Sequence, residues 1–213
     1  MKTYPGIIQG SEEWDNLRRP RATASNAKKI ITAAKGLLSA SAKDYAIALA
    51  AQSFYDSDPN PPPRFIGNAH TDNGHEREPL AREAFSALTG KAVETMGFCT
   101  TDDGLFGCSP DMVISGSERG GEIKCPMLET HCGYLLAGAL PDDYKPQVHF
   151  SLAVTGWQSW DFVSFFPDLP LLHVEVRRDA YTDAVLRAMD DFRILYAEAK
   201  RDLARKFSGG KAA

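Results

Sequence analysis

Residues 92 to 126 lose the helical spacing of apolar residues found elsewhere in the chain and alternate with a period of two instead. Three short segments, AVETMGFCT (92–100), LFGCSPDMVI (105–114) and GGEIKCP (120–126), are separated by the turn signals TDDG and SERGG. A period of two places successive side chains on opposite faces, which is typical of β-strands. The middle of the chain is therefore predicted to be a meander of three strands.

Helical spacing returns on both sides of this meander. The segment at 23–35 is predicted to form a helix capped by Ser25, and another helix is predicted to start near Glu76. The further predicted elements are helices at 44–54, 128–140 and 145–156, strands at 157–168 and 171–178, and a long C-terminal helix. The proline-rich stretch at 56–64 is predicted to be a loop. This order predicts an α/β (α+β) fold with a central mixed β-sheet flanked by helices.

Composition excludes several classes of protein. The chain has 213 residues, of which 43% are hydrophobic and 24% are charged, so we expect a single domain over residues 1–213 with a disordered tail from about residue 207. No apolar run approaches the length of a membrane span, and the first ten residues lack the apolar stretch of a signal peptide. A cytoplasmic protein without a membrane partner is therefore expected. The four cysteines form no CxxC pair, which favours buried free thiols over disulfides or a zinc site.

The formal net charge of −4 conceals a strongly basic segment. Between Arg18 and Lys43 there are seven basic residues and no acidic one, so the rest of the chain carries a charge of −11. A concentrated positive field attracts a polyanion even when the whole protein is acidic. The segment therefore predicts phosphate binding, although a solvated helical face is an equally open interpretation.

Acidic residues and a lysine gather at the end of the predicted meander. Asp111 and Glu122 lie on strands that are expected to pair, with the backbone carbonyl of Ile123 and the side chain of Lys124 beside them. Glu78, on the preceding helix, is expected to point inward. Carboxylates of this kind hold one or two Mg²⁺ ions, and a lysine can orient water or stabilise charge on a phosphate. A salt bridge at a strand edge is the alternative that the spacing alone leaves open.

Five blocks of sequence carry a resemblance to a known family. The blocks are EEWDNLRRPRATAS, GHEREPLAREAF, CSPDMVI, GEIKCP and YKPQVHFSLAVTGWQSWDFVSFFPD. In this order, and over nearly the whole chain, they resemble the bacteriophage lambda exonuclease family of viral alkaline exonucleases, which implies a restriction-endonuclease-like nuclease core. Met112 and Pro20 stand where the family has glycine, and His149 stands where it commonly has glutamine. None of these departures removes a proposed ligand, so they affect loop geometry rather than chemistry.

The resemblance implies roles for particular residues. The implied catalytic residues are Lys124, Glu122, Asp111 and Gln147. The implied metal ligands are Asp111, Glu122 and the carbonyl of Ile123, with Glu78 as a further acidic residue near the metals. The implied contacts to DNA and its 5′-phosphate are Arg18, Ser25, Ser109 and Tyr144. The physical chemistry agrees, because a guanidinium can grip a phosphate with two hydrogen bonds and a helix N-terminus favours anions.

The same resemblance implies a Mg²⁺-dependent exonuclease that uses two ions, for which Mn²⁺ can substitute. The enzyme would enter double-stranded DNA at an end, degrade one strand from its 5′ end to 5′-mononucleotides and leave 3′ single-stranded DNA for recombination by strand annealing. Its implied partners are DNA ends, two further copies in a ring-shaped homotrimer and a single-strand annealing protein, in the bacterial host of a phage or prophage. Two alternatives stay open: a structure-selective or site-specific endonuclease on the same fold, and an inactive DNA-end-binding protein.

Overall fold

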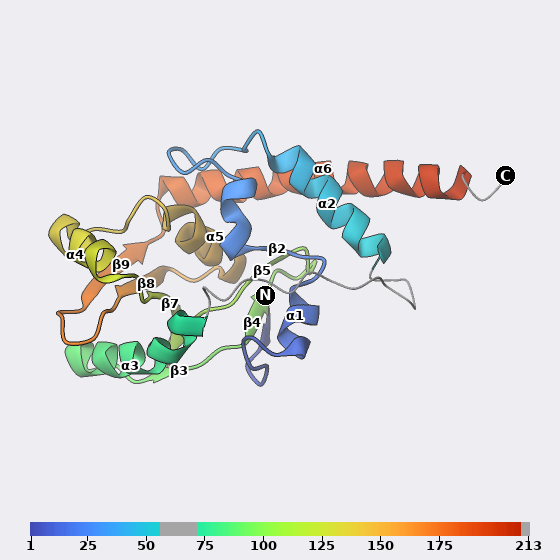
Figure 1. Cartoon of the computed structure of the whole chain (residues 1–213). Coiled ribbons are helices and arrows are strands. Elements are labelled where there is room, and N and C mark those ends of the chain that lie inside the picture. The colour runs from blue at the N-terminus through green and yellow to red at the C-terminus, as the bar shows by residue number, and fades with distance from the viewer. Residues whose placement is uncertain (56–71, 210–213) are drawn as a thin grey trace.

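Strand β7 (Arg119–Lys124) lies in the middle of the larger of two sheets in the computed structural model, which describes residues 1–55 and 72–209 (Figure 1). The sheet has the order β3-β6-β7-β8-β9 in those ranges, and the other strands are β3 (Val93–Glu94), β6 (Met112–Ile114), β8 (Ser159–Ser164) and β9 (Leu172–Arg177). Strands β7 and β8 pair in parallel, whereas the other pairs are antiparallel, so the sheet is mixed. The predicted α/β fold with a mixed sheet is confirmed.

The smaller sheet joins the N-terminal strand to the first half of the expected meander. Its order is β1-β4-β5-β2, with β1 (Lys2–Tyr4), β4 (Phe98–Thr100), β5 (Phe106–Cys108) and β2 (Ala22–Thr23). The expected three-strand meander is therefore wrong in one respect, because segments 92–100 and 105–114 each divide between the two sheets. The first divides at Gly97, where a Cβ would collide with neighbouring backbone. The second divides at Pro110, which has no N–H to donate to a strand ladder.

Helices cover both faces of the larger sheet (Figure 1). Helix α5 (Lys145–Thr155) is almost wholly buried, and α6 (Ala180–Gly209) packs against both α5 and α2 (Ala42–Tyr55). Helix α3 (Asp72–Thr89) packs against β7 and β8 at the bottom of the view. Shorter helices are α1 (Glu12–Arg18), the 3₁₀ helix η1 (Ala24–Lys29) and α4 (Leu128–Ala137).

The two faces of β8 belong to two separate apolar cores. Phe162 packs in the core that includes α5 and α6, whereas Val163 packs with Phe85 of α3. Strand β8 is thus buried on both faces, as its crowding of aromatic residues predicts. The same alternation in β7 directs Ile123 toward α3 and Glu122 toward α5. This alternation places the predicted catalytic side chains on one face of the sheet.

The helix predicted to begin at Ser25 is wrong in both length and cap. Helical geometry covers only Ala24–Lys29, as a 3₁₀ helix, and Thr23 is the residue that precedes it. Ser25 lies inside the turn, where its hydroxyl contacts that of Thr23. The chain then reverses, because Ile31 and Leu38 form an antiparallel bridge in place of a further helical turn.

Two other predicted boundaries shift. Helix α3 begins at Asp72, four residues before Glu76, so Pro79, which a start at Glu76 would place in the first turn, lies further inside the helix. Helix α6 continues to Gly209, two residues beyond the expected start of the tail at 207. The proline-rich loop predicted at 56–64 falls outside the described residues.

The expectation of buried free thiols is confirmed for two of the four cysteines. All four are free thiols; Cys99 and Cys108 are buried opposite each other on β4 and β5, whereas Cys125 and Cys132 are only partly buried. In the ranges that the structure describes, no helix is both long and apolar enough to cross a membrane.

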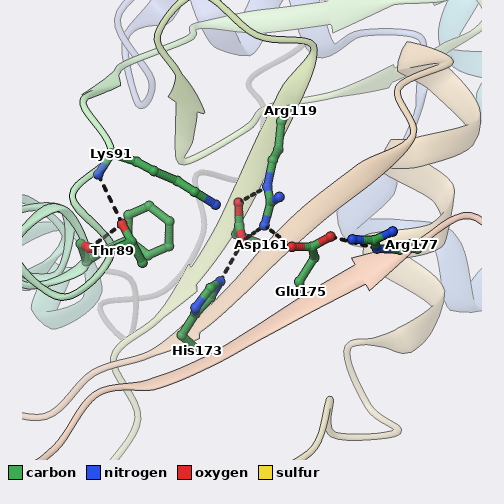
Figure 2. Close-up of polar contacts among 8 residues, drawn as sticks. Thr89, Lys91, Arg119, Asp161, His173, Glu175 and Arg177 are labelled. Carbon is green, nitrogen blue, oxygen red and sulfur yellow. Dashed lines mark hydrogen bonds and ion pairs between the residues drawn. The ribbon is translucent and has the colours of Figure 1, made fainter.

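A cluster of charged side chains lies on the α3 side of the larger sheet (Figure 2). Asp161 is fully buried, and Arg119 donates hydrogen bonds to both of its carboxylate oxygens. His173 Nε2 lies 2.6 Å from Asp161 Oδ1, and Arg119 also contacts Glu175 at 2.9 Å. Burial would raise the pKa of Asp161, but the hydrogen bonds from His173 and Arg119 outweigh burial and hold that pKa below its ordinary value. The cluster ties β7, β8 and β9 together.

Substitution Asp161→Asn should destabilise the protein by about 3 kcal/mol, since it leaves Arg119 without its buried carboxylate partner. Denaturant unfolding at pH 7 measures this change. The control is Arg177→Ala, because Arg177 is 81% exposed in its pair with Glu175 and should change stability by less than about 1 kcal/mol. The difference in unfolding free energy between Asp161→Asn and wild type should narrow as the pH falls toward the lowered pKa of Asp161, because protonated Asp161 is uncharged, as asparagine is. A difference that stays constant down to acidic pH would contradict the charged role.

Candidate active site

A cavity of about 380 Å³ is lined by every residue to which the resemblance gave a catalytic, metal-binding or phosphate-binding role, whereas the other basic residues between Arg18 and Lys43 do not line it. It is lined by Arg18, Ser25, Glu78, Ser109, Asp111, Glu122, Ile123, Lys124, Tyr144 and Gln147, together with Gln9, Trp14, Cys125 and Pro126. These residues come from α1 and the segment before it, η1, α3, the turn between β5 and β6, β7 and the two residues after it, and α5 with the residue before it. Segments far apart in the sequence therefore converge on one concave surface.

Two carboxylates face the cavity: Glu122 from β7, and Asp111, which was expected on a strand but lies in the turn before β6. Asp111 precedes β6, and its backbone N–H donates to the carbonyl of Gly121 at 3.0 Å. Its carboxylate Oδ2 accepts the N–H of Ile123 at 2.7 Å, which holds it against β7 beside Glu122. Burial and then the negative charge of Glu122 raise the pKa of Asp111 well above its ordinary value. A cation bound between these two carboxylates would offset their mutual repulsion, so the pair is suited to binding one.

Lys124 and Gln147 both bind the buried carboxylate of Glu122. Lys124 Nζ lies 2.5 Å from Glu122 Oε1, and Gln147 Nε2 donates to the same oxygen at 2.6 Å. Burial lowers the pKa of Lys124, but the charges of Glu122 and Asp111 outweigh burial and raise it above its ordinary value. Lys124 is therefore a fixed positive charge at neutral pH, suited to stabilising a phosphate. The ring of Tyr144 lies 5.3 Å from Lys124 Nζ, and burial is the main cause that raises the pKa of Tyr144 to about 12.

Glu78 reaches the cavity from α3, as its position on the helix predicts. Arg82, one turn further along, lies 3.8 Å from Glu78 Oε2 and donates to the backbone carbonyl of Asp111 at 3.1 Å. The helix thus brings a third carboxylate to the site, and a guanidinium joins that helix to the turn that carries Asp111.

Arg18, Ser25 and Ser109 lie at the same cavity and are connected by hydrogen bonds. Arg18 Nη2 donates to Ser25 Oγ at 3.0 Å, and the Arg18 guanidinium stacks 4.1 Å above the ring of Trp14. Trp14 Nε1 donates in turn to Ser109 Oγ at 2.9 Å. Burial lowers the pKa of Arg18, although the group stays charged at any physiological pH. A guanidinium and two hydroxyls held in this way match the chemistry of a phosphate.

The donor set fits a hard divalent cation. Among the described residues, no group of three or more His, Cys, Asp and Glu side chains is arranged to hold a metal. Mg²⁺ does not need such a group, because proteins bind it through one or two carboxylates and leave the other positions to water and substrate phosphates. Asp111, Glu122 and the carbonyl of Ile123 are oxygen donors of this kind, and all three residues line the cavity.

Sequence reasoning missed Gln9, Trp14 and Arg82 as residues of this site. Trp14 and Arg18 are four residues apart, a spacing that places them together on a helix, so this contact could have been predicted had α1 been expected. The Gln9 and Arg82 contacts link segments 101 and 29 residues apart, and no local pattern indicates them.

The fold matches that of phage-type alkaline exonucleases. A crystal structure of an alkaline exonuclease, LHK-Exo from Laribacter hongkongensis, is similar over 95% of this chain and 100% of that chain, with 27% identity and a TM-score of 0.76. LHK-Exo in complex with dAMP is similar over 92% and 99%, with 28% identity and a TM-score of 0.70. A phage-related exonuclease from Haemophilus somnus 129PT shares the fold over 89% and 99%, with 17% identity and a TM-score of 0.61.

The chain belongs to the family of the YqaJ-like viral recombinase domain, which matches residues 13–158. No curated protein matches the sequence. The resemblance to viral alkaline exonucleases inferred from the five sequence blocks is therefore confirmed, and the matched region includes every residue predicted for the site.

Proposed function

We propose that this protein is a metal-dependent exonuclease that degrades one strand of double-stranded DNA from its 5′ end. It releases 5′-mononucleotides and leaves 3′ single-stranded DNA for recombination by strand annealing. The observation that carries this proposal is the single cavity in which the carboxylate pair and Lys124 lie beside Arg18, Ser25 and Ser109. The activity of LHK-Exo and its complex with dAMP support a DNA substrate.

Each residue of the site has its own role in the proposed reaction. Asp111, Glu122 and the Ile123 carbonyl would hold two Mg²⁺ ions, for which Mn²⁺ can substitute. The bound metal would act as a Lewis acid and activate the attacking water. Lys124 stabilises the negative charge that develops on the scissile phosphate. Gln147, which bonds to Glu122, keeps that carboxylate in place.

The partners follow from the same proposal. The substrate is a DNA end, drawn in by the basic segment between Arg18 and Lys43. We propose further that the protein assembles as a ring-shaped homotrimer and acts with a single-strand annealing protein. Both of these proposals rest on the resemblance to the viral exonucleases.

Labelled DNA tests the reaction. Linear duplex labelled at either the 5′ or the 3′ terminus, incubated with Mg²⁺, should release the 5′ label first and as a mononucleotide, while a closed circle stays intact. Cleavage of the circle would identify the endonuclease alternative. Binding of ends without any release would identify an inactive end-binding protein.

If the enzyme degrades DNA from the 5′ end, Arg18 should make it prefer a 5′-phosphorylated end. Wild type should degrade 5′-phosphorylated duplex faster than 5′-hydroxyl duplex, because Arg18 adds a charge-assisted contact worth roughly 1.5–3 kcal/mol. Arg18→Ala should reduce the ratio of these two degradation rates about tenfold or more. Lys35→Ala is the control, since it removes one charge from the same basic segment at an exposed position outside the cavity. Initial rates on the two substrates measure the ratio, and equal rates in wild type would refute the polarity.

A further inference from the structure

The turn Ser109–Asp111 connects the two sheets and borders two cavities. The first is the active-site cavity, lined by Ser109 and Asp111. The second has a volume of about 320 Å³, and its lining includes Gln9, Arg82 and again Asp111. Because Asp111 borders solvent-accessible space in both cavities, packing alone does not fix its position. Its position depends on the hydrogen bonds that reach the turn.

Gln9 provides the first of these hydrogen bonds. Its side-chain Nε2 donates to the carbonyl of Pro110 at 2.8 Å and to the carbonyl of Met96 at 2.8 Å. Both hydrogens of the amide are therefore used, and they join the turn to the chain that enters β4. Gln9, like Asp111, lines both cavities.

Arg82, on α3, provides the second hydrogen bond to the turn. It donates to the carbonyl of Asp111 at 3.1 Å, whereas Gln9 binds the carbonyl of the residue before it. Two successive carbonyls of the turn are thus held by side chains from the N-terminal segment and from α3. Movement of either carbonyl would rotate the Asp111 backbone and carry its carboxylate away from the N–H of Ile123 and from Glu122.

We propose that Gln9 and Arg82 are positioning residues that fix the backbone of Pro110 and Asp111 and so hold the Asp111 carboxylate in place for the metal. This proposal rests on the proposed function, because it concerns the metal site of that reaction. Neither side chain needs to touch the scissile phosphate. Misplacement of a reacting group by about 1 Å can cost on the order of 10²-fold in rate, so contacts of this kind have large effects.

The first test measures metal binding, with Mn²⁺ as the probe in isothermal titration calorimetry. Gln9→Met removes the donor and keeps a side chain of similar length, and Arg82→Met removes the guanidinium while keeping an unbranched apolar side chain. Both should weaken Mn²⁺ binding about five- to tenfold, and Arg82→Lys, which keeps a charged donor, should recover part of the loss. Electrostatics alone gives the opposite result for Arg82→Met, because the loss of a positive charge near the site favours a cation. Tighter or unchanged Mn²⁺ binding in Arg82→Met would overturn the proposal.

The second test is amide hydrogen exchange, which needs no catalysis. Loss of either tether should accelerate exchange at the amide of Ile123, which bonds to the Asp111 carboxylate, and at the amide of Asp111, which bonds to Gly121. Exchange at Phe162 in the buried strand β8 should not change. Gln158→Ala is the matched control, since the Gln158 amide donates to a carbonyl at the exposed end of α5. Unchanged exchange at Ile123 in the folded variants would refute the positioning role.

The two proposals fail in different ways. If wild type releases no nucleotide with Mg²⁺, the proposed function fails, while the exchange experiment still decides whether Gln9 and Arg82 hold the turn. If wild type is active and both variants match it in kcat, in Mn²⁺ affinity and in exchange, the positioning role alone is wrong.

Discussion

Asp111→Asn should abolish DNA cleavage and, without metal, make the folded protein more stable. The asparagine side chain would keep the shape of the aspartate and the oxygen that accepts the N–H of Ile123, but it cannot offer a charged ligand. We expect a loss of about 10³-fold or more in kcat, equivalent to roughly 4 kcal/mol of barrier. Because burial and Glu122 raise the pKa of Asp111, its ionised form opposes folding at neutral pH, and the neutral amide removes that cost.

Thermal unfolding in EDTA and in Mg²⁺ separates the two effects of this substitution. Mg²⁺ should raise the Tm of wild type, since a ligand that binds only the folded state stabilises it, and should do little for Asp111→Asn. Duplex DNA should still bind to the variant in Ca²⁺. If Asp111→Asn keeps more than about a tenth of wild-type turnover, a loss under about 1.4 kcal/mol, the assignment of Asp111 as a metal ligand is wrong.

The location of the candidate catalytic residues was predictable because several of them are close in sequence. Glu122, Ile123 and Lys124 alternate on one strand, so their directions follow from the period of two. Asp111 precedes the strand that pairs with β7, and a short antiparallel connection places it beside Glu122. The inward direction of Glu78 follows from the helical period and the position of the apolar stripe on its helix.

The rest of the architecture depends on contacts between distant segments. The division of segments 92–100 and 105–114 between two sheets requires β1 to pair with β4 and β2 to pair with β5. Both pairs join the first 25 residues to the middle of the chain, and strands of two or three residues leave little pattern to detect. The helix predicted at Ser25 failed for a related reason, because apolar spacing cannot distinguish a short 3₁₀ helix followed by a reversal from a longer α-helix.

Lys124→Ala should lower kcat by on the order of 10²-fold or more with little change in DNA binding. Lys124 is paired directly with the carboxylate of Glu122, and its raised pKa keeps it charged throughout the pH range in which DNA is stable. A charge fixed in this position acts most strongly when the phosphate gains charge in the transition state. The effect therefore falls on kcat rather than on KM.

A structural role for Lys124 predicts a different result, because Glu122 is buried and Lys124 is its charged partner. Removing only the lysine should then lower the Tm while leaving the activity of each folded molecule intact. Kinetics and thermal unfolding on the same preparation of Lys124→Ala distinguish these roles, and added Mg²⁺ should restore much of the stability by compensating Glu122. Arg205→Ala is the control, since Arg205 lies outside the basic segment in an exposed ion pair with Asp202 and should change neither quantity by much. A variant that recovers its stability in Mg²⁺ but not its turnover would show that the charge of Lys124 serves the phosphate rather than the fold.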